Sequence, residues 1–182
     1  VQSLEKSAHK TPVSLFEEAV TAANKAVFEE SASHVEYEGM GTTVVACTLE
    51  ENTLYIANIG DSRLYLIRDG IEQITDDHSL VEEMVKQGNI TESEARIHPQ
   101  KNIITRALGI NEEVQADFFE IDVEQGDVIM LCSDGLSNMI EDEDMEYIVK
   151  NSDTLQTAAE SLVARANENG GNDNITVVLA EV

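Results

Sequence analysis

Several residue types are scarce in this chain of 182 residues, and each shortage excludes a class of protein. Only 11 residues are Lys or Arg against 36 Asp or Glu, which gives a formal net charge of -25. An acidic surface of this kind repels the phosphates of nucleic acids and of anionic lipids, so we expect no nucleic acid partner and no membrane partner. No apolar run approaches the length that crosses a bilayer, and no signal peptide is recognisable.

Cysteine is almost absent as well. Cys47 and Cys132 each stand alone in an apolar run, and neither belongs to a C-x-x-C pair. We therefore predict two buried thiols in a reducing compartment, and a cytoplasmic location. A chain of this length can bury one substantial core, so we expect a single domain over residues 1–182.

Hydrophobic periodicity predicts a mixture of helices and strands. The predicted helices cover residues 13–31, 79–87, a short stretch after Thr91, 141–150 and 154–168. The predicted strands cover residues 42–49, 54–59, 63–68, 71–74, 115–121, 128–131 and 175–179. The first helix has two possible starts, a capping box at Ser14 to Glu17 or the pair Thr11-Pro12. Short turns between successive strands, with helices grouped between hairpins, favour an α+β fold in which antiparallel sheet packs under helices.

Three aspartates stand at the ends of predicted strands rather than on helices. Asp61 lies in a bend between two strands, Asp134 follows residues 128–131, and Asp173 precedes the last strand. An ionised carboxylate near apolar segments is costly unless a cation compensates it. Carboxylates that converge in one cleft would select Mg²⁺ or Mn²⁺, which prefer hard oxygen ligands. Taken singly, each aspartate is more typical of a turn, so spacing alone is a weak indication.

Five short segments carry a family resemblance because they occur together and in a fixed order. They are Gly39-Met40-Gly41-Thr42-Thr43, Asn58-Ile59-Gly60-Asp61-Ser62-Arg63, Thr75-Asp76-Asp77-His78-Ser79-Leu80, Ser133-Asp134-Gly135-Leu136 and Gly171-Asn172-Asp173-Asn174-Ile175-Thr176. The set resembles the metal-dependent Ser/Thr protein phosphatases of the PPM type (type 2C), in their bacterial form. The resemblance implies a sandwich of two antiparallel β-sheets flanked by helices, a four-layer αββα arrangement. It also implies hydrolysis of phosphoserine and phosphothreonine by a metal-activated water at a dinuclear Mn²⁺ or Mg²⁺ centre.

By the same resemblance, individual residues acquire expected roles. Asp134 and Asp173 match metal-binding aspartates of the family, and Asp61 matches an aspartate that joins Asp134 in holding a weaker third ion in some members. Residues 84–110 correspond to a flap beside the cleft that is linked to substrate choice. The implied partners are phosphoserine and phosphothreonine proteins and a cognate Ser/Thr kinase. His78 and His98 fall in or near the flap, and we interpret them as ordinary surface or capping histidines.

One departure from the family pattern limits these expectations. The family begins with an Arg-x-x-Asn-Glu-Asp stretch and an Asp-Gly-x-Gly-Gly-His stretch, and this sequence contains neither. In the family those stretches supply a phosphate-contacting arginine, an outer metal aspartate and the aspartate that bridges both metals. The chain thus resembles the C-terminal portion of such an enzyme, with the N-terminal strands missing. We expect open strand edges, an uncovered apolar face and, for the fragment alone, almost no activity.

Other function classes find less support in the sequence. Gly60-Asp61-Ser62 is similar to the signature of serine esterases, but a nucleophile at Ser62 needs a downstream base and no histidine follows His98. Neither cysteine is followed closely by the arginine of a thiol phosphatase. The acidic run Glu141 to Asp144 lacks the glycine and ligand spacing of an EF-hand. The serious alternative is a non-catalytic module, a truncated or pseudophosphatase domain that binds phosphoproteins or a kinase.

Overall fold

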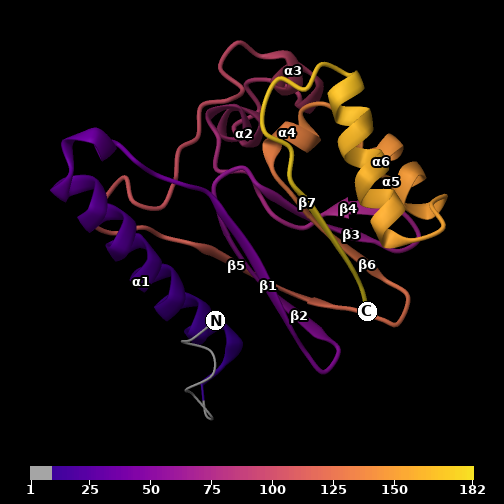
Figure 1. Cartoon of the computed structure of the whole chain (residues 1–182), viewed down its shortest axis with the longest axis horizontal. Helices are drawn as coiled ribbons and strands as arrows, with labels where there is room; N and C mark the ends of the chain where they lie inside the picture. Colours follow the sequence, from indigo (N-terminus) through magenta and orange to yellow (C-terminus); the bar gives the residue numbers. More distant parts are fainter. Residues whose placement is uncertain (1–9) are drawn as a thin grey trace.

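The computed structural model describes residues 10–182, which form helices and strands in mixed order (Figure 1). The α-helices are α1 (Pro12–Ser33), α2 (Leu80–Lys86), α3 (Glu92–Ile97), α4 (Asp134–Ser137), α5 (Asp142–Lys150) and α6 (Leu155–Glu168), with a 3₁₀ turn η2 (Val35–Tyr37). The strands are β1 (Val44–Glu50), β2 (Thr53–Ile59), β3 (Arg63–Ile67), β4 (Ile71–Gln73), β5 (Asp117–Asp122), β6 (Val128–Cys132) and β7 (Val177–Glu181).

The strands form two sheets in which every pairing is antiparallel. One sheet has the order β1-β2-β5, and the other has the order β4-β3-β6-β7. Consecutive strands pair through the hairpins β1–β2 and β3–β4, as the turn residues predicted. The predicted α+β fold with two antiparallel sheets is therefore confirmed.

Successive side chains of a strand point to opposite faces of its sheet, so the apolar side chains form three separate clusters, one between each pair of neighbouring layers. Leu64 and Leu66 of β3 pack between the two sheets, where they meet Leu54 and Ile56 of β2. Tyr65 and Ile67 of the same strand point the other way, into a cluster built with α4, α5 and α6. On the far side, Val20 of α1 packs against Ile59 and Leu108. Helices thus flank a two-sheet sandwich on both sides (Figure 1), which confirms the four-layer αββα arrangement.

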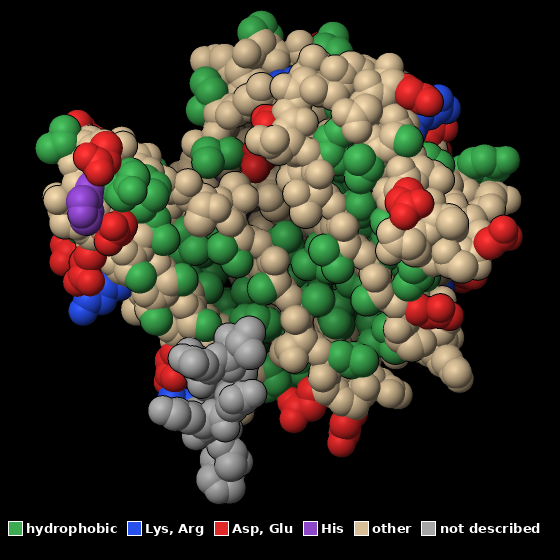
Figure 2. Space-filling view, viewed as in Figure 1, with side chains coloured by type: hydrophobic (Ala, Val, Ile, Leu, Met, Phe, Trp, Pro, Cys, Tyr) green, Lys and Arg blue, Asp and Glu red, His purple; other side chains and the backbone are tan. Residues whose placement is uncertain are grey.

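Part of the sandwich is open to solvent within residues 10–182. Strands β1 and β7 stand at sheet edges, and Leu49 of β1 and Val178 of β7 are 46% and 54% exposed. Figure 2 shows apolar side chains gathered over the strands between α1 and the pair α5 and α6. Edge strands and apolar side chains are thus exposed on this face of the described residues, and the link that we made to missing strands stays a prediction.

The boundaries differ from the predictions in a few places. Helix α1 begins at the Thr11-Pro12 pair, with the Thr11 side chain accepting from the backbone of Ser14, so the capping box at Ser14 to Glu17 is wrong. Helix α4 and the turn η2 were not predicted, because segments of three or four residues carry no periodic signal. No helix in the described part of the chain combines the length and apolarity that a membrane span requires.

Candidate metal centre

Strand register brings the three predicted aspartates to one end of the four-stranded sheet. Arg63 of β3 pairs with Cys132 of β6, which in turn pairs with Val177 of β7. Asp61 precedes Arg63, Asp134 follows Cys132, and Asp173 precedes Val177. Because neighbouring strands run in opposite directions, all three aspartates leave the sheet at the same end.

Asp134 and Asp173 lie on segments that are in direct contact. The Ser133 backbone N–H donates to the carbonyl of Thr176 at 3.1 Å, and the Ser133 hydroxyl donates to the carbonyl of Asn174, also at 3.1 Å. A Cβ placed on Gly135 would stand 2.3 Å from the carbonyl oxygen of Asn174. Only glycine therefore lets the turn after β6 approach the Asp173 loop this closely.

Electrostatics also links the aspartates. Burial, followed by repulsion from Asp134 and Asp77, raises the pKa of Asp61 to about 6. Burial and then the Asp173 carboxylate raise the pKa of Asp134 above its usual range. Partly buried carboxylates that stand close to other carboxylates are poised to accept a cation, which relieves both the desolvation and the repulsion.

A tight bend carries Asp61. Gly60 adopts a φ of 106°, and a Cβ at this residue would lie 2.3 Å from Cγ2 of Thr43, so both the backbone conformation and the space require glycine. The carbonyl of Gly60 accepts from the side-chain amide of Asn58 at 3.3 Å and from the backbone N–H of His78 at 2.9 Å. These contacts fix the glycine from which the chain enters Asp61.

Next to Asp61, a partly buried ion pair forms the floor of a cavity. Arg63 donates from Nε to Asp77 Oδ1 at 2.9 Å and from Nη2 to Asp77 Oδ2 at 2.8 Å, with the two side chains 20% and 12% exposed. A third donor, Nη1, reaches the hydroxyl of Tyr65 at 2.9 Å. Sequence reasoning missed this pair, because nothing in the spacing of two residues 14 positions apart predicts their contact.

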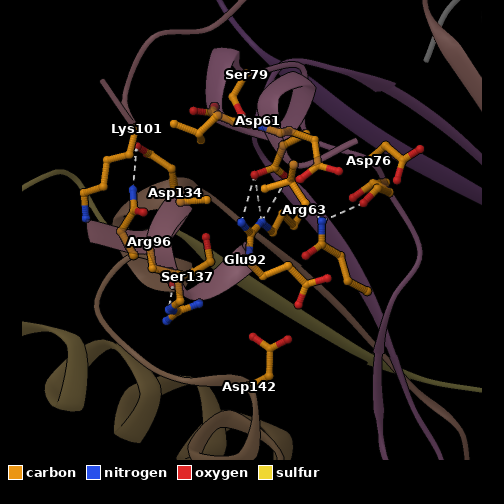
Figure 3. A pocket seen from close by; sticks show the side chains of 18 of the residues that line it. Asp61, Arg63, Asp76, Ser79, Glu92, Arg96, Lys101, Asp134, Ser137 and Asp142 are labelled. Atoms are coloured by element: carbon orange, nitrogen blue, oxygen red, sulfur yellow. Dashed lines mark hydrogen bonds and ion pairs between the residues drawn. The ribbon is translucent and has the colours of Figure 1, made fainter. Parts of the chain in front are cut away.

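The cavity, of about 570 Å³, extends from the aspartates to the predicted flap. Asp61 and Asp134 line it together with Glu92 and Lys101 of residues 84–110 (Figure 3). Arg96 of α3 ties the flap to the rest of the molecule. Its guanidinium donates to the carbonyls of Ser137 and Ile140 at 3.3 Å and pairs with Glu141 at 3.0 Å.

Two sequence interpretations of single residues need correction. His78 is no surface or capping residue: it is 4% exposed and lies between Gly60 and Asp117. Of the two cysteines, Cys132 is buried and Cys47 is only partly buried; both are free thiols. His98, in contrast, does end α3, where its Nδ1 accepts from the backbone of Gln100, so the capping interpretation is confirmed there.

The two weaker enzyme and ion-binding alternatives also fail on geometry. The Ser62 hydroxyl pairs with the Thr43 hydroxyl at 3.0 Å, whereas His78 uses its ring nitrogens on Gly60 and Asp117. A serine without a positioned base is not an activated nucleophile. The acidic run at Glu141 to Asp144 forms the start of α5, where negative charge stabilises a helix N-terminus.

The carboxylates at this end of the sheet fit a divalent ion in part. Asp61, Asp134 and Asp173 offer hard oxygen atoms of the kind that Mn²⁺ and Mg²⁺ select. Among the residues described, however, no group of three or more His, Cys, Asp or Glu side chains is close enough together to hold a metal by itself. The side chains therefore fit part of a metal centre, in agreement with the missing motifs.

Comparisons with known proteins identify the family. The sequence pattern of protein phosphatase 2C matches residues 2–180. The chain is 42% identical over 166 residues to the serine/threonine phosphatase stp of Listeria monocytogenes, covering 91% of this chain and 66% of that relative. The crystal structure of the serine/threonine phosphatase Stp1 from Staphylococcus aureus superposes with a TM-score of 0.92 at 33% identity, covering 100% of this chain and 74% of that one.

A further solved structure is informative about metals. The catalytic domain of the serine threonine protein phosphatase PstP, crystallised in complex with 2 manganese ions, superposes with a TM-score of 0.88 at 34% identity. That comparison covers 99% of this chain and 75% of that one. The chain spans about two thirds of the length of the Listeria relative that it matches. On the family pattern, the identities and the fold together, the chain belongs to the protein phosphatase 2C family.

Proposed function

We propose that the protein built on this chain is a protein Ser/Thr phosphatase that depends on Mn²⁺ or Mg²⁺. The observation that carries the proposal is the convergence of Asp61, Asp134 and Asp173 at one end of the sheet, where Asp134 helps to raise the pKa of Asp61 and Asp173 helps to raise that of Asp134. The Listeria relative bears the name of a serine/threonine phosphatase, and the PstP structure holds two manganese ions, which supports the same reading.

Each side chain has a proposed part. Asp134 and Asp173 would hold one ion of the dinuclear centre, and Asp61 together with Asp134 would hold a weaker third ion. When bound, divalent ions would lower the pKa of a water molecule and neutralise charge on a phosphoryl group. Arg63 is committed to Asp77 and Tyr65, so its role is to fix the cavity floor rather than to grip phosphate. Residues 84–110, as a flap, form the wall that a phosphoprotein substrate meets.

Partners and location follow from the proposed chemistry. The substrates are phosphoserine and phosphothreonine proteins, and a cognate Ser/Thr kinase supplies them. The 182-residue chain alone should be nearly inactive, because it lacks the bridging aspartate that lets two ions act on one water. The cytoplasm stays our prediction for where this takes place.

Hydrolysis of a phosphothreonine peptide in excess Mn²⁺ tests the proposal. The chain is assayed alone and with a separate segment that bears the Arg-x-x-Asn-Glu-Asp and Asp-Gly-x-Gly-Gly-His motifs. Turnover should appear only with the segment and should be abolished by Asp134→Asn, while Asp144→Asn, on the exposed start of α5, leaves it unchanged. Full turnover by the chain alone would show that other residues build the site. Binding of the phosphopeptide without turnover in any combination would favour the non-catalytic module.

A further inference from the structure

His78 occupies a buried place in which both ring nitrogens have partners. The backbone N–H of Gly60 donates to its Nδ1 at 3.1 Å, and its Nε2 lies 3.1 Å from Oδ2 of Asp117. Because a backbone N–H can only donate, Nδ1 must be the unprotonated acceptor, and Nε2 must carry the proton that it donates to Asp117. The two contacts therefore fix one neutral tautomer of the ring.

The same residue holds Gly60 a second time through its backbone. The His78 N–H donates to the Gly60 carbonyl at 2.9 Å, so both polar backbone groups of Gly60 are bound to His78. The Gly60 N–H belongs to the peptide that joins Ile59 to Gly60. The Gly60 carbonyl belongs to the peptide that joins Gly60 to Asp61. His78, together with the Asn58 amide on the same carbonyl, thus restrains the flexible glycine that precedes Asp61.

On its other side, His78 is joined to the base of the segment 84–110. Its carbonyl accepts from the backbone N–H of Thr105 at 2.8 Å. Its partner Asp117 also accepts from Nη1 of Arg106 at 2.7 Å. Burial lowers the pKa of His78 despite the hydrogen bond to Asp117, which agrees with a neutral ring. The contacts run without a break from Arg106 through Asp117 and His78 to Gly60.

We propose that His78 is a positioning residue that holds the Asp61 carboxylate toward Asp134 and couples that ligand to the base of the flap. The inference rests on the metal site proposed above. In this role the histidine contacts neither metal nor substrate, and it acts only through its hydrogen bonds to Gly60, the residue before Asp61. Loss of the Nδ1 acceptor should release the Gly60 N–H, while the Gly60 carbonyl keeps its bonds to the backbone N–H of residue 78 and to the Asn58 amide. The loosened bend should weaken Mn²⁺ binding at Asp61, while Asp134 and Asp173 keep their own contacts.

Two substitutions separate the two ring contacts. His78→Asn places an amide oxygen near the position of Nδ1, so it keeps the acceptor for Gly60 and loses the reach to Asp117. His78→Gln does the reverse, since its terminal amide can reach Asp117 and no acceptor faces Gly60. A purely structural role, that of filling a buried space, predicts similar effects from both. His34→Gln, an exposed histidine at the end of α1, serves as the matched control.

The measurement is ¹⁵N NMR of the 182-residue chain during Mn²⁺ titration, following paramagnetic broadening of the Asp61 and Asp134 amide signals. The apparent Mn²⁺ dissociation constant measured at Asp61 should rise about 10-fold in His78→Gln, an effect of the size known for loss of a group that orients a metal ligand. It should stay within about twofold in His78→Asn and in His34→Gln. Equal weakening in the Asn and Gln variants, or none in either, would overturn the inference.

A second readout needs no variant. In the unaltered chain, scalar coupling across the Gly60 N–H to Nδ1 hydrogen bond should be detectable, with Nδ1 resonating as an unprotonated nitrogen. A proton on Nδ1 would overturn the inference even if every variant failed to fold. Absence of Mn²⁺ broadening at Asp61 in the unaltered chain would overturn the proposed metal site and this inference together. Normal broadening there, with unchanged affinity in His78→Gln, would overturn the inference alone.

Discussion

Replacing Asp61 by Asn should stabilise the metal-free protein at neutral pH, although it removes a ligand. Burial, with repulsion from Asp134 and Asp77, raises the pKa of this carboxyl to about 6 in the folded chain. Its pKa in the unfolded chain is close to the reference value of about 3.9. A group whose pKa is raised on folding costs stability once it ionises, so the cost is absent below about pH 4 and complete above about pH 6.

The size of the effect follows from the same pKa difference. One pKa unit corresponds to about 1.4 kcal/mol, so the full difference would be about 3 kcal/mol. Asp61 is only partly buried, and solvent screens the charge of a group that water still reaches. We therefore expect Asp61→Asn to gain about 1–2 kcal/mol in free energy of unfolding at neutral pH, and almost nothing at about pH 4.

Urea denaturation in the presence of a chelator, at acidic and at neutral pH, measures this difference. Addition of Mn²⁺ should then stabilise the unaltered chain more than the variant, because an ion that binds only the folded state stabilises it by mass action. Asp144→Asn, which lies on the exposed start of α5, is the control for removing one negative charge. A variant no more stable than the unaltered chain at neutral pH, or equally stabilised at both pH values, would refute the reasoning.

Two further substitutions probe the structure around the site. Asp77→Ala should cost about 3 kcal/mol because it leaves Arg63 partly buried without its counter-ion, and the added change Arg63→Met should recover most of that loss in urea melts. A loss of less than about 0.5 kcal/mol would mean that the pair is only a surface contact. Gly135→Ala should destabilise the chain and weaken Mn²⁺ binding, because its Cβ would meet the Asn174 carbonyl at 2.3 Å; Gly70→Ala, with open space around it, is the control, and equal effects would contradict the close approach.

The sequence was most informative where a regular pattern covers a whole element. The strand predicted over residues 63–68 is present as β3, and the structure places its side chains in two separate apolar clusters. The sequence left two possible starts for α1, and the structure has the one at Thr11-Pro12, where the Thr11 side chain accepts from the Ser14 N–H. The very short helix α4 gave no signal, because one helical turn has no periodicity to detect.

The candidate site could be predicted only in part. The three aspartates were identified from their places at strand ends, and strand register then brought them to one end of the sheet. The groups that support them were not found. His78 and Asp77 act on Gly60 and Arg63 from the loop between β4 and α2, and such contacts leave no trace in residue spacing. His78 was misread for the same reason, since burial of one histidine in a loop depends on packing from β5 and the flap.

The central claim is that this chain holds part of a dinuclear centre, and the number of Mn²⁺ ions that it binds tests that claim most directly. Isothermal titration calorimetry of the 182-residue chain should show no pair of tight sites, and the binding that is present should be lost in Asp134→Asn and kept in Asp144→Asn. Addition of the segment with the two missing motifs should create the tight pair. Two tight Mn²⁺ sites in the chain alone, unaffected by Asp134→Asn, would contradict the account.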